Sequence, residues 1–217
     1  MTVKETAKRY ILFAISLFFM GLGIALTKHG DLGVSPISSL ANVVSMKFTF
    51  LTFGTWLMIT NFLMILGQII LLRRNFKLIQ LLQIPISFAF GYCTDLGMMI
   101  VGGIPNDNYI VKLVLVLSGI VVLGFGITLG VIADVVLNSG EAFVKAISDV
   151  TKKDFGNTKI FFDVSLVVLS VILSLIFFDG KVIGTREGTL LSALCLGFVV
   201  KFFRRLLQKP LEAVLKK

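Results

Sequence analysis

The sequence predicts an all-α integral membrane protein with six transmembrane helices, arranged as two inverted three-helix repeats. Three observations lead to this fold class. Hydrophobic residues make up 56% of the 217 positions, six apolar stretches are long enough to cross a bilayer, and one pattern recurs after about 103 residues. Charged residues make up 15%, against roughly 25% in soluble domains. At a mean hydropathy of +0.96, a core of this size cannot bury the apolar surface, so lipid is the expected solvent.

Six apolar stretches predict the spans, because roughly 20 helical residues cover the hydrocarbon core. They lie at about 10–28, 51–72, 79–101, 110–133, 159–178 and 184–203. Pro85 falls within the first two turns of the third stretch, where proline is tolerated or kinks the helix. Two further segments, at about 36–48 and 139–150, carry one apolar face but are too short to span.

The connections between the spans alternate in charge. Lysine and arginine precede the first span, follow the last, and lie between the second and third and between the fourth and fifth, whereas residues 102–109 contain neither. The positive-inside rule therefore predicts that both termini are cytoplasmic. The same bias accounts for the net charge of +9, so no nucleic-acid partner is expected.

The internal repeat divides the chain into residues 1–105 and 106–217. Residues 23–26 read GIAL and residues 126–129 read GITL, and the same offset places Asp31 opposite Asp134. Since each half contains three spans, the second half starts from the opposite side of the membrane, and the repeats are inverted. A two-fold repeat in a membrane chain is typical of transporters.

Each half is expected to carry a capped short helix after its first span. Ser35 takes the N-cap position of one helix, and Pro36 suits the position after it. In the second half Asn138 takes the cap, and Glu141 completes the spacing of a capping box. Two placements stay open. The helices either lie in the headgroup plane or are re-entrant, with their N-termini aimed into a cavity.

Polar residues in or beside the spans are the candidate substrate- or ion-binding residues, because such groups are costly in lipid. The main candidates are Asp31, Ser35, Ser38, Asn42, Asp95, Asp134, Asn138 and Glu141, and the secondary candidates are Gln83, Asp163, Arg186 and Glu187. Their acidic excess favours a cationic or proton-coupled substrate.

Several candidates also have a purely structural interpretation, which the sequence leaves open. Asp31 and Asp134 could be simple helix-end residues, and Asp95 could extend to the membrane surface. Asp163 has a partner in Lys159 at the i, i+4 spacing of a helical ion pair. Arg186 and Glu187 could form a pair of their own.

No catalytic or metal site is expected, and the chain is not predicted to be an enzyme. The motifs of nucleophilic catalysis, phosphate-binding loops and zinc sites do not occur in the sequence. Cys93 and Cys195 lie far apart in apolar stretches, and His29 is the single histidine. No cofactor is therefore predicted.

The residues that follow the first span carry a family resemblance. The run DLGVSP at 31–36, the GIAL run before it, and Gly184, Thr185 and Gly197 resemble the YczE/YitT-like bacterial integral membrane proteins over essentially the whole chain. The sequence lacks the soluble C-terminal domain of the longer YitT relatives, so the resemblance is to the short YczE-like branch. It implies a multi-pass protein of the bacterial cytoplasmic membrane, and it leaves the substrate open.

Three functions are compatible with these patterns. The first is a small secondary transporter with its substrate site between inverted repeats. The second is a substrate-binding membrane subunit of an energy-coupled uptake system, and the third is a non-transporting accessory or assembly protein. The expected partners are the lipid bilayer and a small molecule or ion. The small-residue spacing Gly126-x-x-x-Gly130 serves internal packing or a homodimer.

Overall fold

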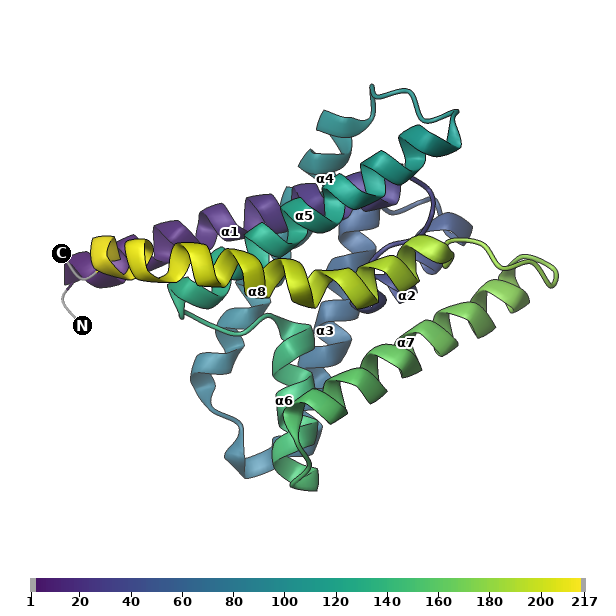
Figure 1. Cartoon of the computed structure of the whole chain (residues 1–217). Helices are drawn as coiled ribbons and strands as arrows, with labels where there is room; N and C mark the ends of the chain where they lie inside the picture. Colours follow the sequence, from purple (N-terminus) through teal and green to yellow (C-terminus); the bar gives the residue numbers. More distant parts are fainter. Residues whose placement is uncertain (1–2, 216–217) are drawn as a thin grey trace.

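The computed structural model describes residues 3–215, and within that range the chain is helical with no strands. Figure 1 shows the arrangement of the helices. The α-helices are α1 (Val3–His29), α2 (Pro36–Lys47), α3 (Phe53–Leu72), α4 (Gln83–Val101), α5 (Tyr109–Ala133), α6 (Ser139–Thr151), α7 (Phe155–Phe177) and α8 (Glu187–Leu215). Two 3₁₀ turns, η1 (Arg73–Asn75) and η2 (Leu78–Leu82), connect α3 to α4.

Five helical segments of the described residues are long and apolar enough to cross a membrane. They are Val3–His29, Phe53–Asn75, Leu78–Val101, Tyr109–Ala133 and Phe155–Phe177. The predicted sixth span falls on the first part of α8. There Glu187, Lys201 and Arg204 interrupt the apolar run, so α8 is not among the five. The protein is thus a helical membrane protein by composition.

The centre of the fold is the antiparallel crossing of α1 and α5 (Figure 1). Gly23 lies against Leu123, and Gly126 lies against Met20. A Cβ atom at Gly23 would be 2.7 Å from the Leu123 Cα, and one at Gly126 would be 2.6 Å from the Met20 N. Because the obstructing atoms belong to the backbone, only glycine allows the two helices to come this close.

The outer helices continue this packing. α4 packs across α1, with Gly21 of α1 against the backbone of Cys93 and Thr94. α8 runs along α5 in the same direction (Figure 1). The Thr128 hydroxyl donates to the Val200 carbonyl at 3.3 Å across this second contact.

Each short helix packs on a long helix from the other half of the chain. α2 lies on α7, and α6 lies on α3. Val144 and Phe143 of α6 share a cluster with Met64 of α3 and Phe162 of α7. The two halves are therefore interleaved and do not form separate domains.

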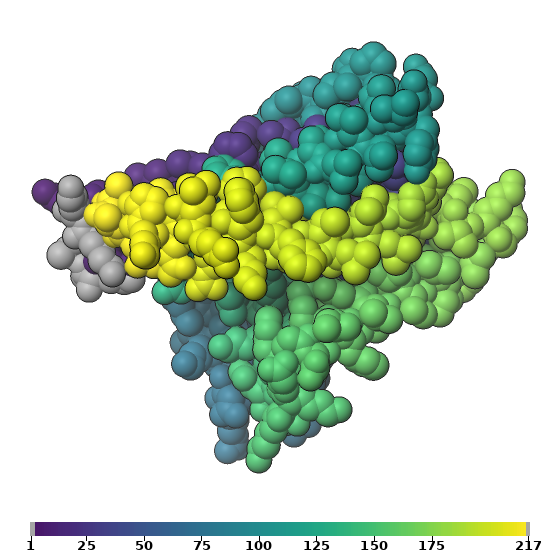
Figure 2. Space-filling model, viewed as in Figure 1, coloured from purple at the N-terminus to yellow at the C-terminus, as the bar shows by residue number. Residues whose placement is uncertain are grey.

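The two halves differ in how their last two helices meet. α3 packs along α4, with Gly54 against the Gly91 carbonyl. By contrast, α7 and α8 diverge from the loop at 178–186 (Figure 1). Figure 2 shows α8 across the front of the molecule, with α6 and α7 below it. This divergence is where the candidate site lies.

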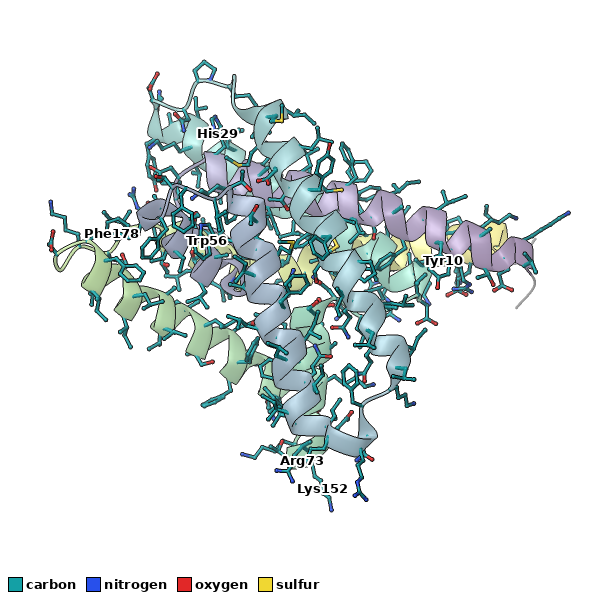
Figure 3. The ribbon with its side chains drawn as sticks, turned by 180° about the vertical axis from the view of Figure 1, so that it is seen from behind. Tyr10, His29, Trp56, Arg73, Lys152 and Phe178 are labelled. Atoms are coloured by element: carbon teal, nitrogen blue, oxygen red, sulfur yellow. The ribbon has the colours of Figure 1, made fainter. Side chains whose placement is uncertain are left out.

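The basic connections after α3 and α6 lie at one end of the molecule. Figure 3 shows Arg73 and Lys152 at the lower end of the molecule, away from His29 and Phe178. Arg9, near the start of α1, is buried and donates to the Ala133 carbonyl at 3.1 Å, so it caps the last turn of α5.

Candidate functional site

A cavity of about 550 Å³ lies between the starts of α2 and α6 and the facing sides of α3, α5, α7 and α8. Most of its wall is apolar, and the polar residues are few and converge on it. They are Ser35, Ser38, Thr60, Asn61, Asn138, Glu141, Lys159, Asp163 and Ser192. An apolar cavity with a few convergent polar groups is the usual form of a small-molecule site. We call it the Glu141 cavity.

The two short helices start beside each other at this cavity. A Cβ atom at Gly140 of α6 would lie 3.1 Å from the Ile37 Cδ1 of α2. Ser35 and Asn138, the residues at the two N-cap positions, both line the cavity. Tertiary packing has thus brought together two segments that are about one hundred residues apart in the sequence.

Both predicted N-cap positions are correct, and one of the two side chains makes the expected cap bond. Ser35 makes no side-chain cap bond, because its hydroxyl is bonded to the Ser38 hydroxyl at 3.1 Å. The Asn138 side chain does cap α6, accepting from the Ser139 N–H at 2.8 Å. The capping box expected with Glu141 does not form, because the Glu141 side chain lines the cavity.

Glu141 is the distinctive group of the cavity. Within residues 3–215 its carboxylate has no hydrogen-bond partner. Burial raises the pKa of this carboxyl above its usual value, Lys159 opposes the shift, and Asp163 adds to it. Glu141 therefore keeps its proton at a higher pH than an exposed glutamate, as is common for groups at functional sites.

Asp163 lines the cavity as one half of an ion pair. Lys159 donates to its carboxylate at 2.6 Å, and each side chain is about a quarter exposed, at 27% and 23%. The structure thus contains the predicted i, i+4 pair. Since the two charges offset each other, the protonation of Glu141 determines the net charge of the cavity.

Two buried polar groups of the cavity lack a partner within the described residues. They are the Asn61 Nδ2 and the Ser192 Oγ, and these side chains are 4% and 0% exposed. An unsatisfied buried donor costs about 1–3 kcal/mol. Such groups in a cavity wall are therefore expected to bind a ligand or water. Neither residue was predicted from the sequence, although Thr60 and Asn61 form a polar pair inside an apolar stretch.

Asp31 and Asp134 lie outside the cavity. They end α1 and α5 in the left-handed conformation, with φ values of 53° and 51°. Both side chains are exposed, and Asp31 pairs with Lys112 at 3.3 Å. This arrangement is the helix-end alternative that the sequence left open.

Four other candidates are engaged elsewhere. Asn42 accepts a hydrogen bond from Lys28 and donates to the Gly184 carbonyl at 2.6 Å. Gln83 exchanges hydrogen bonds with Gln68 at 3.0 and 3.1 Å. Arg186 and Glu187 pair with each other at 3.2 Å and are more than one-third exposed.

Asp95 joins α4 to the start of α3. Its carboxylate accepts from the Thr52 hydroxyl at 2.6 Å and from the Gly54 N–H at 2.8 Å. A carboxylate in this position caps the helix and complements its dipole. The structure thus places Asp95 at a helix–helix contact and not in the cavity.

Replacing Asp95 with alanine is expected to lower the free energy of unfolding by about 2 kcal/mol, since charge-assisted hydrogen bonds contribute about 1.5–3 kcal/mol. The measurement is thermal unfolding of the purified protein in detergent. Asp149→Ala is the matched control, because Asp149 is exposed near the end of α6, and it should change stability by less than about 0.5 kcal/mol. Equal losses in the two variants would refute the cap assignment.

Residues 7–205 match the family of unknown function DUF6198. The chain belongs to this family. The matched region contains every residue that lines the Glu141 cavity. No curated protein matches the chain, and no solved structure does.

Proposed function

We propose that this DUF6198 protein is a small secondary transporter that binds its substrate in the Glu141 cavity, with a proton or another cation coupled through Glu141. The cavity itself carries this proposal. Within the part of the chain that the structure describes, an unpaired carboxylate, an unpartnered amide and an unpartnered hydroxyl face one space, where the starts of α2 and α6 meet. Helix starts that face a substrate between two halves are a recurring feature of secondary transporters.

The contacts between α1 and α5 support an inverted repeat. Gly23 and Met20 of α1 correspond to Gly126 and Leu123 of α5 at an offset of 103 residues. The pair Gly23–Leu123 and the pair Met20–Gly126 are therefore exchanged by the repeat, and both pairs are in contact. A pseudo-two-fold axis through an antiparallel helix crossing produces such an exchange. The equivalent left-handed ends of α1 and α5 agree with it.

The path of α8 supports a sixth span. It runs alongside α5, which is long and apolar enough to cross the membrane. Near the end of α8 the Val214 carbonyl accepts from the Lys8 ammonium at 3.0 Å, so the end of α8 lies beside the start of α1. Six crossings with both termini on the basic, cytoplasmic side fit this path. On this proposal, the separation of α7 from α8 is one access state, and a matching separation of α3 from α4 is the other.

The relation to the YczE/YitT-like proteins stays part of this proposal, since it rests on the DLGVSP run at 31–36. In the structure that run packs inside the molecule except for the exposed Asp31. Leu32 and Val34 are fully buried, and the Leu32 carbonyl accepts from the Gly188 N–H at 2.7 Å. The motif therefore holds the start of α2 against the start of α8.

A transporter must expose its site to each side of the membrane in turn, and this requirement can be tested without a known substrate. We propose single cysteines at Ser35 and at Ser192 in a protein whose own cysteines, Cys93 and Cys195, are replaced by serine. A membrane-impermeant maleimide should label both positions in right-side-out vesicles and also in inverted vesicles. Asn75→Cys is the control, because Asn75 is exposed in the basic η1 turn and should react from one side only.

Labelling of Ser35→Cys and Ser192→Cys from one side alone, with or without a pH gradient, would refute alternating access. One-sided labelling together with tight, stoichiometric ligand binding would favour the substrate-binding subunit instead. The comparison with Asn75→Cys identifies which side is exposed.

A further inference from the structure

The Glu141 cavity has an opening between α7 and α8. Ile160 of α7 and Ala193 and Gly197 of α8 line the cavity and are also exposed, Ile160 at 65%. A Cβ atom at Gly197 would have no other atom within 4 Å. The opening therefore lies between two helix sides, where a membrane protein meets lipid.

On the side of the 178–186 loop, hydrogen bonds link α2 to the residues that precede α8. The Asn42 side chain links α2 to the Gly184 carbonyl, and Lys28 donates to the same side chain. The part of α7 that borders the opening begins next to the basic residues Lys152 and Lys153. The opening thus faces the membrane leaflet nearer the basic loops.

The charges of the cavity favour a cation. Lys159 and Asp163 neutralise each other, which leaves the Glu141 carboxylate. The start of α2 has few free donors for an anion. Pro36 has no N–H group, and the Ser38 N–H already donates to the Ser35 carbonyl at 2.9 Å. At the start of α6, Glu141 itself offsets the helix dipole.

We propose that the Glu141 cavity binds an amphipathic monovalent organic cation, which enters sideways from the lipid leaflet through the gap between α7 and α8. The positive group lies at Glu141, in the cavity that the Asn61 amide and the Ser192 hydroxyl also line. The apolar body lies against the apolar faces of α5 and α8, among them Leu123 and Leu196. This inference deepens the proposed function and rests on it for movement across the membrane, whereas binding and lateral entry stand alone.

The test uses Glu141 as a reporter of access in the protein reconstituted into liposomes. Dicyclohexylcarbodiimide, a lipid-soluble reagent, adds to a protonated carboxyl group and yields an N-acylurea, which mass spectrometry locates. We expect it to modify Glu141 at neutral pH at least ten times faster than a water-soluble carbodiimide does. Glu141→Gln identifies the signal, since it removes the reactive group.

The ligand class is tested with two ions of nearly the same shape and opposite charge. Tetraphenylphosphonium should slow the modification of Glu141 at least ten-fold, and tetraphenylborate should not. Protection by tetraphenylborate alone, or by neither ion, would overturn the assignment of a cation.

The route is tested by filling the opening. Gly197→Trp should slow modification by the lipid-soluble reagent at least ten-fold, because the added ring occupies the open space. Leu194→Trp is the matched control on α8, since Leu194 is 69% exposed and does not line the cavity. Ala193→Trp provides a second block, and size-exclusion profiles check that each variant folds.

An unchanged rate in both blocking variants would overturn lateral entry, as would a failure of the lipid-soluble reagent to modify Glu141. The result is separable from the proposed function. Protection by tetraphenylphosphonium with one-sided cysteine labelling would keep the binding site and remove transport. Two-sided labelling without protection would keep transport and remove this ligand class.

Discussion

Replacing Gly23 with leucine is expected to leave little folded protein. The side chain would meet the backbone of Leu123, whose Cα lies 2.7 Å from the position of the first added carbon. Overpacking in a core costs about 1–3 kcal/mol even when side chains can move aside. Here the obstructing atoms belong to the backbone of α5, which cannot move aside in the same way. Because α1 belongs to the first half and α5 to the second, this crossing joins the two halves, and the whole fold depends on it. The measurement is the yield of monodisperse protein and its melting temperature in detergent.

Two further variants show whether the close approach is the cause. Gly126→Leu, at the equivalent position of α5, should cause a similar loss. Gly197→Ala should stabilise the protein by about 0.5–1 kcal/mol, because a helical glycine with open space around it gains from a methyl group. A Gly23→Leu protein that melts like the wild type would show that the crossing is not tightly packed.

Replacing Glu141 with glutamine is expected to abolish the pH dependence of cation binding. In the wild type, binding should strengthen as the pH rises, because the ionised carboxylate is the proposed binding form. The midpoint should lie above that of an ordinary glutamate, since burial raises the pKa of Glu141. With glutamine the affinity should fall about ten-fold or more, which corresponds to the loss of one interaction with a charged group. Equilibrium binding of tetraphenylphosphonium from roughly pH 5 to 9 measures both effects.

The same substitution has a stability signature with a defined sign. Since the pKa of Glu141 is raised in the folded state, the folded protein binds more protons than the unfolded chain between the two pKa values. The contribution of Glu141 to stability is therefore greatest at low pH and falls as the pH rises through the folded pKa. Glu141→Gln should remove this fall, so the variant should exceed the wild type in stability at alkaline pH.

Asp149→Asn is the control for both measurements, because Asp149 is an exposed carboxylate on the same helix. It should follow the wild-type profiles of binding and melting temperature. Parallel pH profiles of the wild type and Glu141→Gln would show that Glu141 does not titrate in this range.

The short helices were predictable because their signals are local. A cap residue and an apolar stripe place α2 and α6 at 36–48 and 139–150, and the structure has Pro36–Lys47 and Ser139–Thr151. The ends of the long helices were less predictable. α1 starts at Val3 and α8 runs on to Leu215, because charged turns outside an apolar stretch still form helix. The start of α4 is shifted to Gln83 by the 3₁₀ turn before it.

The candidate site was only partly predictable from the sequence. Ser35, Ser38, Asn138 and Glu141 line the cavity, together with the secondary candidate Asp163. The repeat-matched pair Asp31 and Asp134 does not, and Asn61 and Ser192 were not identified. A polar residue in an apolar stretch is visible in the sequence, whereas the direction in which it points depends on helices packed from elsewhere in the chain.

The sequence by itself determined that this is a helical membrane protein with basic and non-basic connections, because the partition of a segment between water and lipid depends on its own residues. Only the tertiary structure decided that the starts of α2 and α6 meet, and that α3 packs on α4 whereas α7 and α8 diverge. These features arise from backbone contacts between helices far apart in the chain, such as Gly54 with Gly91. This difference between the two halves opens the Glu141 cavity on one side. The sequence does not reveal the difference, because both halves share one pattern.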